Sequence, residues 1–214
     1  MNDLLPAALA IAASPFPLIP AILLLFSPRA RVTSTSFLLG WFVGVALPTV
    51  VFVLASDLVE GSDYTPRWVS WTRLVLGAAL VAFGVRQWLT RKAQTDEPAW
   101  MRGLADATPG SALRLGLILS AANPKILLLA AAGAVSIATD HRGFAIEAAL
   151  ILGFSLVASI SVAVPVCAYL VLGERALAPL GKVRDWLQVN NAALMAVVMV
   201  VIGCVVGVKG LTGL

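Results

Sequence analysis

The chain has 214 residues, of which 60% are hydrophobic and 12% are charged. A soluble domain is about half apolar and about a quarter charged, so much of this apolar surface has to face lipid. The net charge of +4 comes from basic residues in short loops between apolar runs, which form no single stripe and argue against nucleic-acid binding. The composition therefore indicates an integral membrane protein.

Six apolar segments are long enough to cross a bilayer. About 20 helical residues span the hydrocarbon core, where every backbone polar group must be paired. The first segment lacks the basic start of a signal peptide and carries Asp3 just before it, so we expect it to be retained. We predict an all-α, polytopic membrane protein with six transmembrane helices at Leu4–Phe26, Phe37–Leu54, Trp68–Leu89, Ala112–Ala138, Phe144–Leu172 and Leu187–Val208.

The distribution of Lys and Arg predicts the orientation, because cytoplasmic loops are enriched in them. Ten lie in or next to the connections after the first, third and fifth segments: Arg29, Arg31, Arg86, Arg91, Lys92, Arg102, Arg114, Arg175, Lys182 and Arg184. Four lie at the other side: Arg67, Arg73, Arg142 and Lys209. We therefore expect a multi-pass plasma membrane protein with both termini outside the cytoplasm.

The two halves of the chain share landmarks in the same order. SPFPLIPAILLL (14–25) corresponds to NPKILLLAAAG (123–133), LLGWF (38–42) to ILGFS (151–155), and FGVRQWL (83–89) to VGVKGL (206–211). Because each half has three helices, the second enters the membrane from the opposite side, as in transporters with inverted repeats. We predict one membrane domain, 1–214, with a first three-helix repeat (1–92), a cytoplasmic linker (93–111) and a second three-helix repeat (112–214).

Three smaller features of the sequence also carry predictions. Gly40 and Gly44, and likewise Gly203 and Gly207, have the Gly-x-x-x-Gly spacing that favours close helix packing. The linker is either a short helix on the membrane surface or a flexible connection. Asn190 and Asn191 are expected to cap the sixth helix or to lie at the membrane interface.

Prolines interrupt the first and fourth segments. Pro15, Pro17 and Pro20 lie in the first, and Pro124 lies in the fourth. Proline removes the hydrogen bond to the carbonyl four residues earlier, so we expect four free carbonyls: Ile11, Ala13, Phe16 and Ser120. Both breaks lie roughly 17 Å from the segment starts, near the bilayer midplane. Such paired breaks predict a transport site, although a lone proline is more often a simple kink.

Lys125 is the one charged residue in the middle of a predicted span. Burying it there costs about 3 kcal/mol, and no Asp or Glu lies in mid-span to pair with it. We expect Lys125 to face the bundle interior and to meet freed carbonyls or an anionic substrate group. The alternative is that its side chain extends to the membrane interface. Asn123, beside it, donates and accepts hydrogen bonds and suits unwound backbone or a polar head group.

The sequence lacks the residues that several kinds of chemistry require. No Asp, Glu or His lies in mid-span, so we expect no metal site, no cofactor and no carboxylate proton relay inside the membrane. There is also no glycine-rich loop of the kind that binds ATP phosphates. We expect a protein that is not an enzyme, because there is no buried acid–base pair.

Three motifs resemble those of a known family. SPFPLIPAILLLFSPRAR, FLLGWFVG and NPKILLLAAAG are similar to the signatures of the lysine exporter superfamily. Within it they resemble the GAP family, the peptidoglycolipid-addressing and sulfolipid-addressing proteins of mycolic-acid-bearing actinobacteria. The resemblance covers essentially the whole chain. It implies six helices in two inverted repeats and a role in bringing envelope glycolipids to the surface, often beside a large lipid exporter.

The resemblance also implies a substrate-binding site. Carried over position by position, it assigns five residues to that site: Pro15, Pro17, Asn123, Pro124 and Lys125. The Pro-Gly-Pro typical of amino-acid exporters reads Pro15-Phe16-Pro17 here, which favours a lipid over an amino acid.

We therefore expect transport of a cell-envelope lipid or glycolipid toward the cell surface. Its partners would be that lipid, the surrounding membrane lipids, and either a large lipid exporter or a second copy in a homodimer. Two alternatives stay open. One is an exporter of small amino acids or polar solutes, and the other is a non-transporting accessory subunit of a larger lipid exporter.

Overall fold

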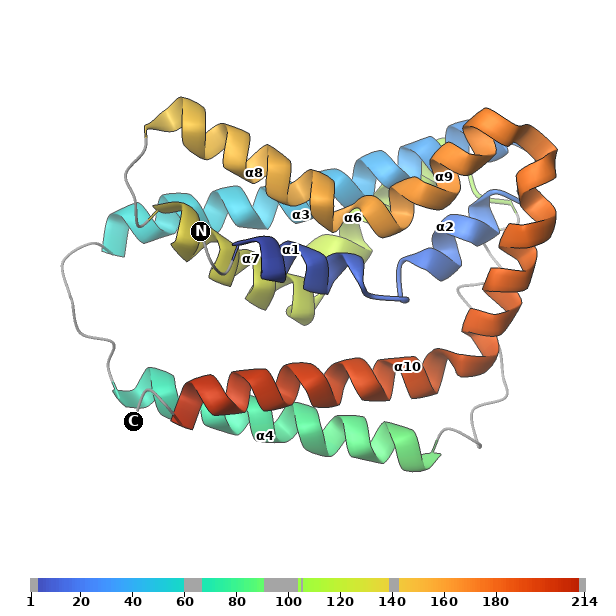
Figure 1. The fold of residues 1–214 in the computed structure, drawn as a ribbon. Coiled ribbons are helices and arrows are strands. Elements are labelled where there is room, and N and C mark those ends of the chain that lie inside the picture. The colour runs from blue at the N-terminus through green and yellow to red at the C-terminus, as the bar shows by residue number, and fades with distance from the viewer. Residues whose placement is uncertain (1–3, 60–66, 91–103, 105, 139–142, 212–214) are drawn as a thin grey trace. The chain divides into compact units, whose positions relative to one another are not determined.

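The computed structural model describes residues 4–59, 67–90, 104, 106–138 and 143–211. These residues contain helices and no strand, which confirms the all-α prediction for this part of the chain. The elements are α1 (Leu4–Ala12), α2 (Leu18–Leu24), α3 (Ala30–Val59), α4 (Arg67–Thr90), α6 (Pro109–Ala121), α7 (Pro124–Ala138), α8 (Phe144–Ala158), α9 (Ile160–Leu172), the 3₁₀ turn η2 (Gly173–Ala176) and α10 (Leu177–Leu211) (Figure 1).

Each apolar segment of the sequence forms helix, and three are divided. The first segment becomes α1 and α2, the fourth becomes α6 and α7, and the fifth becomes α8 and α9. Two continuous stretches of the described residues are long and apolar enough to cross a membrane, Ala30–Ala55 and Ile160–Leu187. The pair α6 and α7, bent by 65°, forms a third if it is counted as one span. The six-span arrangement stays a prediction.

Many large apolar side chains lie on the surface. They include Leu47 on α3, Val171 on α9 and Val189 on α10, which are 55%, 82% and 84% exposed. Exposed apolar residues are normal singly, but a protein in water does not keep so many of them along its helices. These surfaces are consistent with helices that face lipid.

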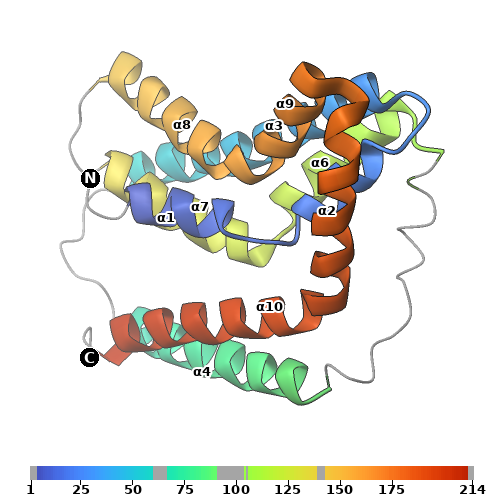
Figure 2. The same ribbon diagram turned by 45° about the vertical axis from the view of Figure 1, so that its right-hand side comes forward.

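The contacts divide the chain into two units, and each has its own packing. The first unit contains residues 1–60 and 98–185, and the second contains 61–97 and 186–214. The second unit holds α4 and the later part of α10, which run side by side in both views (Figures 1 and 2). Asn190 lies inside α10, where its side-chain amide donates to the Trp186 carbonyl at 2.8 Å. The expectation that Asn190 caps a helix start is therefore wrong.

The divided helices of the described residues lie in the first unit. In it α3 packs along both α6 and α7, while α8 packs on α1 and α9 packs on α2. Thus α3 of the first half lies against α6 and α7 of the second half. In the same way, α8 and α9 of the second half lie against α1 and α2 of the first half (Figure 2). One apolar cluster at the centre joins these elements, and it includes Ile11, Trp41, Ile126, Ala158 and Val162.

Glycines allow the closest helix pair in this unit. A Cβ on Gly40 would collide with the Leu113 backbone, and one on Gly44 would collide with Ser120. A Cβ on Gly116 would in turn meet the backbone of Phe37 and Trp41. The prediction that Gly40 and Gly44 permit close packing is confirmed, and the partner is α6. Around the Cβ that Gly207 would carry, the described residues leave open space.

The turn between α2 and α3 is fixed by hydroxyl groups. The Ser27 hydroxyl donates to the Leu24 carbonyl at 2.7 Å and lies 2.8 Å from the Thr33 hydroxyl. Both side chains are buried. Nearby, the Arg184 guanidinium lies over the Phe26 ring, 5.1 Å from its centroid. These contacts stabilise the end of the unit at which α2 meets α3.

Candidate functional site

The first break separates α1 from α2 over Ala13–Pro17. Pro15 and Pro17 are buried there, and Ser14 is 8% exposed. The Ser14 N–H donates to the Ile11 carbonyl at 3.0 Å, so the expectation of a free Ile11 carbonyl is wrong. The Ala13 carbonyl finds no hydrogen-bond partner among the residues that the structure describes. Pro20 does not contribute to the break, because it lies in the first turn of α2, where the missing N–H costs little.

The second break separates α6 from α7 at Ala122 and Asn123. The Ser120 carbonyl, expected to be free because of Pro124, accepts the Asn123 N–H at 3.2 Å. That expectation is therefore also wrong, because the chain tightens into a 3₁₀-like turn that satisfies this acceptor. The tightening and the 65° bend leave two separate helices, each with its own end.

Asn123 begins α7. Its side-chain oxygen accepts the backbone N–H of Lys125 at 3.0 Å, and its carbonyl accepts the Leu127 N–H at 2.9 Å. This is the geometry of a helix N-cap, and Pro124 occupies the first helical position, which suits proline. The role of Asn123 at the break is therefore at least structural, in addition to the substrate contact expected from the sequence.

Lys125 lies in the first turn of α7. Its side chain is half-buried, and it forms no ion pair or side-chain hydrogen bond with the other described residues. The N–H groups at a helix N-terminus carry partial positive charge. Lys125 therefore adds a full positive charge to an end that already favours an anion.

The two breaks lie side by side because α1 runs antiparallel to α7. A Cβ on Gly133 would lie 3.4 Å from a methyl of Leu4, at the start of α1. Seven residues further along α1 is Ile11, and seven residues back along α7 is Ile126, and both belong to the central cluster. Seven residues advance a helix by about 10 Å, so the end of α1 and the start of α7 are opposite each other. Both views show this arrangement (Figures 1 and 2).

The structure thus places all five predicted site residues around neighbouring breaks. Pro15 and Pro17 are buried, Asn123 and Lys125 are half-buried, and Pro124 is exposed. This juxtaposition gives one region with two interrupted helices, a helix N-terminus and a cation. The binding role of these residues stays a prediction.

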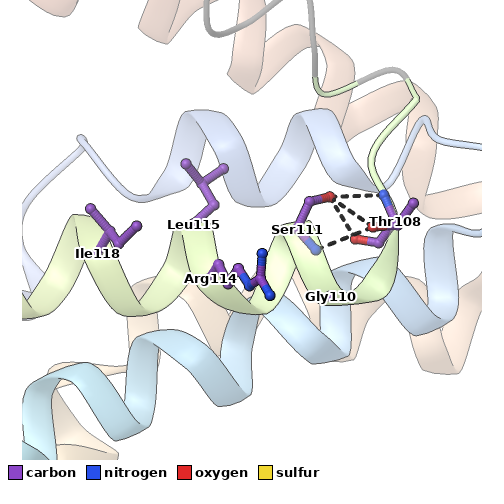
Figure 3. Close-up of a pocket in the computed structure, with 6 residues that line it drawn as sticks. All are labelled: Thr108, Gly110, Ser111, Arg114, Leu115 and Ile118. Carbon is purple, nitrogen blue, oxygen red and sulfur yellow. Dashed lines mark hydrogen bonds between the residues drawn. The ribbon is translucent and has the colours of Figure 1, made fainter.

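A separate open groove of about 460 Å³ lies beside the first half of α6. It is lined by Thr108, Gly110, Ser111, Arg114, Leu115 and Ile118 (Figure 3). Thr108 and Ser111 cap α6 reciprocally, with distances of 3.2 Å from the Ser111 N–H to the Thr108 hydroxyl and 2.9 Å from the Thr108 N–H to the Ser111 hydroxyl. These polar groups are therefore already paired. The groove contains none of the five predicted residues.

Sequence reasoning missed two features of this unit. The fifth segment is interrupted at Ser159, between α8 and α9, although no proline lies at that position. The indole of Trp41 on α3 is buried in the central cluster. The serines at 155, 159 and 161 were the available signal, since such a run of hydroxyls is unusual in an apolar helix.

Comparison with known proteins gives one match. The family described as Sap, sulfolipid-1-addressing protein, matches residues 4–212. No curated protein and no solved structure matches the chain. The family match covers almost the whole sequence, and with it both breaks.

Proposed function

We propose that this chain, which belongs to the sulfolipid-1-addressing protein family, moves a cell-envelope lipid with an anionic head group across the membrane. The head group passes at the two neighbouring breaks, and the acyl chains stay in the bilayer. The observation that carries this proposal is Lys125 at the N-terminus of α7, opposite the end of α1, where it is half-buried and has no ion-pair partner among the described residues.

The cost of the unpaired cation supports an anionic substrate. A lysine in the hydrocarbon region costs about 3 kcal/mol, which an anion next to it would offset. In transporters with broken helices, the positive ends of half-helices point toward anionic substrate groups. Lys125 and the first N–H groups of α7 together offer such an end, and a sulfate or phosphate ester fits it.

The surfaces beside the break support a lipid rather than a soluble anion. Ile118 on α6 and Leu128 on α7 are 59% and 44% exposed, one on each side of the break. Acyl chains of a lipid can lie along such faces while the head group enters the polar region. A small polar solute would gain no favourable contact from apolar surfaces beside the site.

The arrangement of the helices supports alternation between two states. The second helix of each half lies against the broken helix of the other half, and the third helices of both halves, α4 and α10, contribute to the second unit. Two inverted halves packed in this way would give two end states of similar energy. The inverted repeat and the midplane position of the breaks are part of this proposal.

The proposed protein is a transporter and not an enzyme. The matched family is described as sulfolipid-1-addressing, which names a lipid and no reaction. We place it in the plasma membrane, with both termini outside. Transfer to or from a larger lipid exporter is compatible with this role.

Reconstitution into liposomes tests the proposal. The liposomes carry sulfatide with a fluorescent acyl chain, and an impermeant reductant quenches the label in the outer leaflet. The unmodified protein should make the inner-leaflet sulfatide accessible, and Lys125→Met should lose this activity. Lys182→Met, which removes an exposed cation at the start of α10, is the matched control and should retain it.

Other outcomes decide between functions. Amino-acid counterflow without sulfatide movement would favour a solute exporter. Inactivity of the unmodified protein with sulfatide and with phosphatidylglycerol would contradict independent lipid transport and favour an accessory subunit. Equal activity of unmodified protein and Lys125→Met would contradict the site.

A further inference from the structure

Three buried polar atoms in the first unit have no hydrogen-bond partner. They are the indole nitrogen of Trp41 and the hydroxyl oxygens of Ser159 and Ser161, as far as the described residues show. Trp41 is 1% exposed and Ser159 is 3% exposed. An unmet polar group in the interior costs free energy, so native proteins seldom keep one without a ligand, a water or a function to satisfy it.

Three other buried hydroxyls in this unit are satisfied by their own helix. Ser155 donates to the Ile151 carbonyl at 2.8 Å, Ser120 to Gly116 at 2.7 Å and Thr49 to Val45 at 2.9 Å. Ser159 lies one turn after Ser155 and has no such bond from its hydroxyl. The Ser155 carbonyl, the acceptor that this pattern predicts, takes only the backbone N–H of Ser159 at 3.1 Å, as in a regular helix, and not the Ser159 hydroxyl. Ser159 thus differs from these residues in its hydroxyl, which has no hydrogen-bond partner among the described residues.

These atoms lie near the proposed passage. Trp41 belongs to the central cluster together with Ala158 and Val162, which flank Ser159 and Ser161. The same cluster contains Ile11 and Ile126, which border the other two breaks. Helix α3, which carries Trp41, contacts both α8 and α9 (Figure 1). The unmet hydrogen bonds are therefore in the core that all three interrupted helices share.

We propose that Trp41 and Ser159 bind an uncharged oxygen of the transported head group, such as a sugar hydroxyl or an ester oxygen. The indole N–H is neutral and can only donate, so it requires an acceptor. The Ser159 hydroxyl donates to a second oxygen or accepts from a hydroxyl of the ligand. This inference rests on the proposed function: Lys125 selects the charge of the lipid, and Trp41 and Ser159 select the hydroxylated part of its head group.

Ser159→Ala and Ser155→Ala form a matched pair for the test. The full chain is purified into nanodiscs, and sulfatide is titrated while binding and thermal stability are measured. Ser159→Ala should leave Tm without sulfatide unchanged or higher, because no bond is lost, and should weaken sulfatide binding about fivefold. Ser155→Ala should lower Tm and leave the affinity unchanged. Trp41→Phe keeps an aromatic ring without the N–H and should also weaken binding.

The same titration separates failure of this inference from failure of the proposed function. Full affinity of Ser159→Ala for sulfatide, with binding lost in Lys125→Met, would overturn the role of Ser159 and leave the proposed function intact. A lower Tm of Ser159→Ala without ligand would show that the hydroxyl is held by water or protein, and would overturn it as well. Absence of sulfatide binding by the unmodified protein would overturn both.

Discussion

The side-chain oxygen of Asn123 accepts the backbone N–H of Lys125 at 3.0 Å. Asn123 therefore starts α7 and fixes the direction in which the Lys125 side chain leaves the helix. The hydrogen bond occupies the amide oxygen of Asn123 and leaves its NH₂ group for other partners. The cap and the cation together form the positive end opposite the break between α1 and α2, which links the local geometry to the proposed recognition of an anion.

For sulfatide transport, the charge of the side chain at position 125 should be more important than the shape of that side chain. We expect Lys125→Met to abolish sulfatide movement, since methionine has a similar length but no charge to stabilise the anionic head group. Lys125→Arg should retain part of the activity. Both variants should reach the membrane in normal amounts, because methionine is easier to insert than lysine. The measurement is the rate of label quenching per reconstituted molecule, and equal activity of Lys125→Met and Lys125→Arg would contradict the requirement for charge.

Asn123 should respond differently to substitutions that keep the cap and those that remove it. Asn123→Ala should lower the free energy of unfolding by about 1 kcal/mol, whereas Asn123→Asp should preserve the cap. Asn123→Asp should nevertheless slow transport of an anionic lipid, because it places a negative charge beside Lys125. Thermal unfolding in detergent and sulfatide movement are measured on the same preparations. A fully active Asn123→Asp variant would contradict an anion site here.

The glycines of α3 should tolerate no added methyl group. Gly40→Ala places a Cβ against the backbone of Leu113, which cannot rotate away, so we expect destabilisation of about 1–3 kcal/mol. Gly153→Ala is the matched control on α8, because beyond the adjacent backbone of its own helix no described atom lies within 4 Å of its added Cβ. Alanine has the higher helix propensity, so Gly153→Ala should be neutral or stabilising. Equal losses in unfolding experiments would contradict the tight α3–α6 contact.

The buried hydroxyl network at the turn between α2 and α3 should contribute to stability. Thr33→Val removes the hydroxyl that lies 2.8 Å from Ser27 while keeping the volume, and should cost about 1–3 kcal/mol. Thr35→Val is the control, because Thr35 is exposed and bonds only to carbonyls of its own helix. We expect its effect to stay within about 0.5 kcal/mol. Similar unfolding midpoints for the two variants would show that the network is not stabilising.

Part of this structure follows from the sequence alone. Hydrophobicity located all six helical segments, and Pro15, Pro17 and Pro124 located two breaks, because a missing N–H weakens a helix. Proline alone does not mark a break, since Pro48 and Pro165 lie inside α3 and α9. The spacing of Gly40 and Gly44 predicted a close contact. The sequence did not identify α6 as the partner, since that depends on how the chain packs.

Other features depend on local geometry that a residue pattern does not specify. Counting four residues back from proline predicted a free carbonyl at Ser120, yet a tighter turn provides the Asn123 N–H as a donor. The break at Ser159 occurs without a proline at that position, and the Ser159 N–H still donates to the Ser155 carbonyl as in a regular helix. The start of α10 lies ten residues before the apolar segment, because a helix continues beyond the hydrophobic residues that reveal it.

The central claim is that the two neighbouring breaks form the passage for the lipid head group. The most direct test replaces Cys167 and Cys204 with serine, introduces Ala13→Cys and Ala122→Cys, and joins them with a short linker that a reductant cleaves. Both positions are exposed and lie at the two breaks. Sulfatide movement in liposomes is then measured before cross-linking, after it and after cleavage. The account predicts that the linker forms, that it stops transport and that cleavage restores it; undiminished transport by the fully cross-linked protein would contradict it.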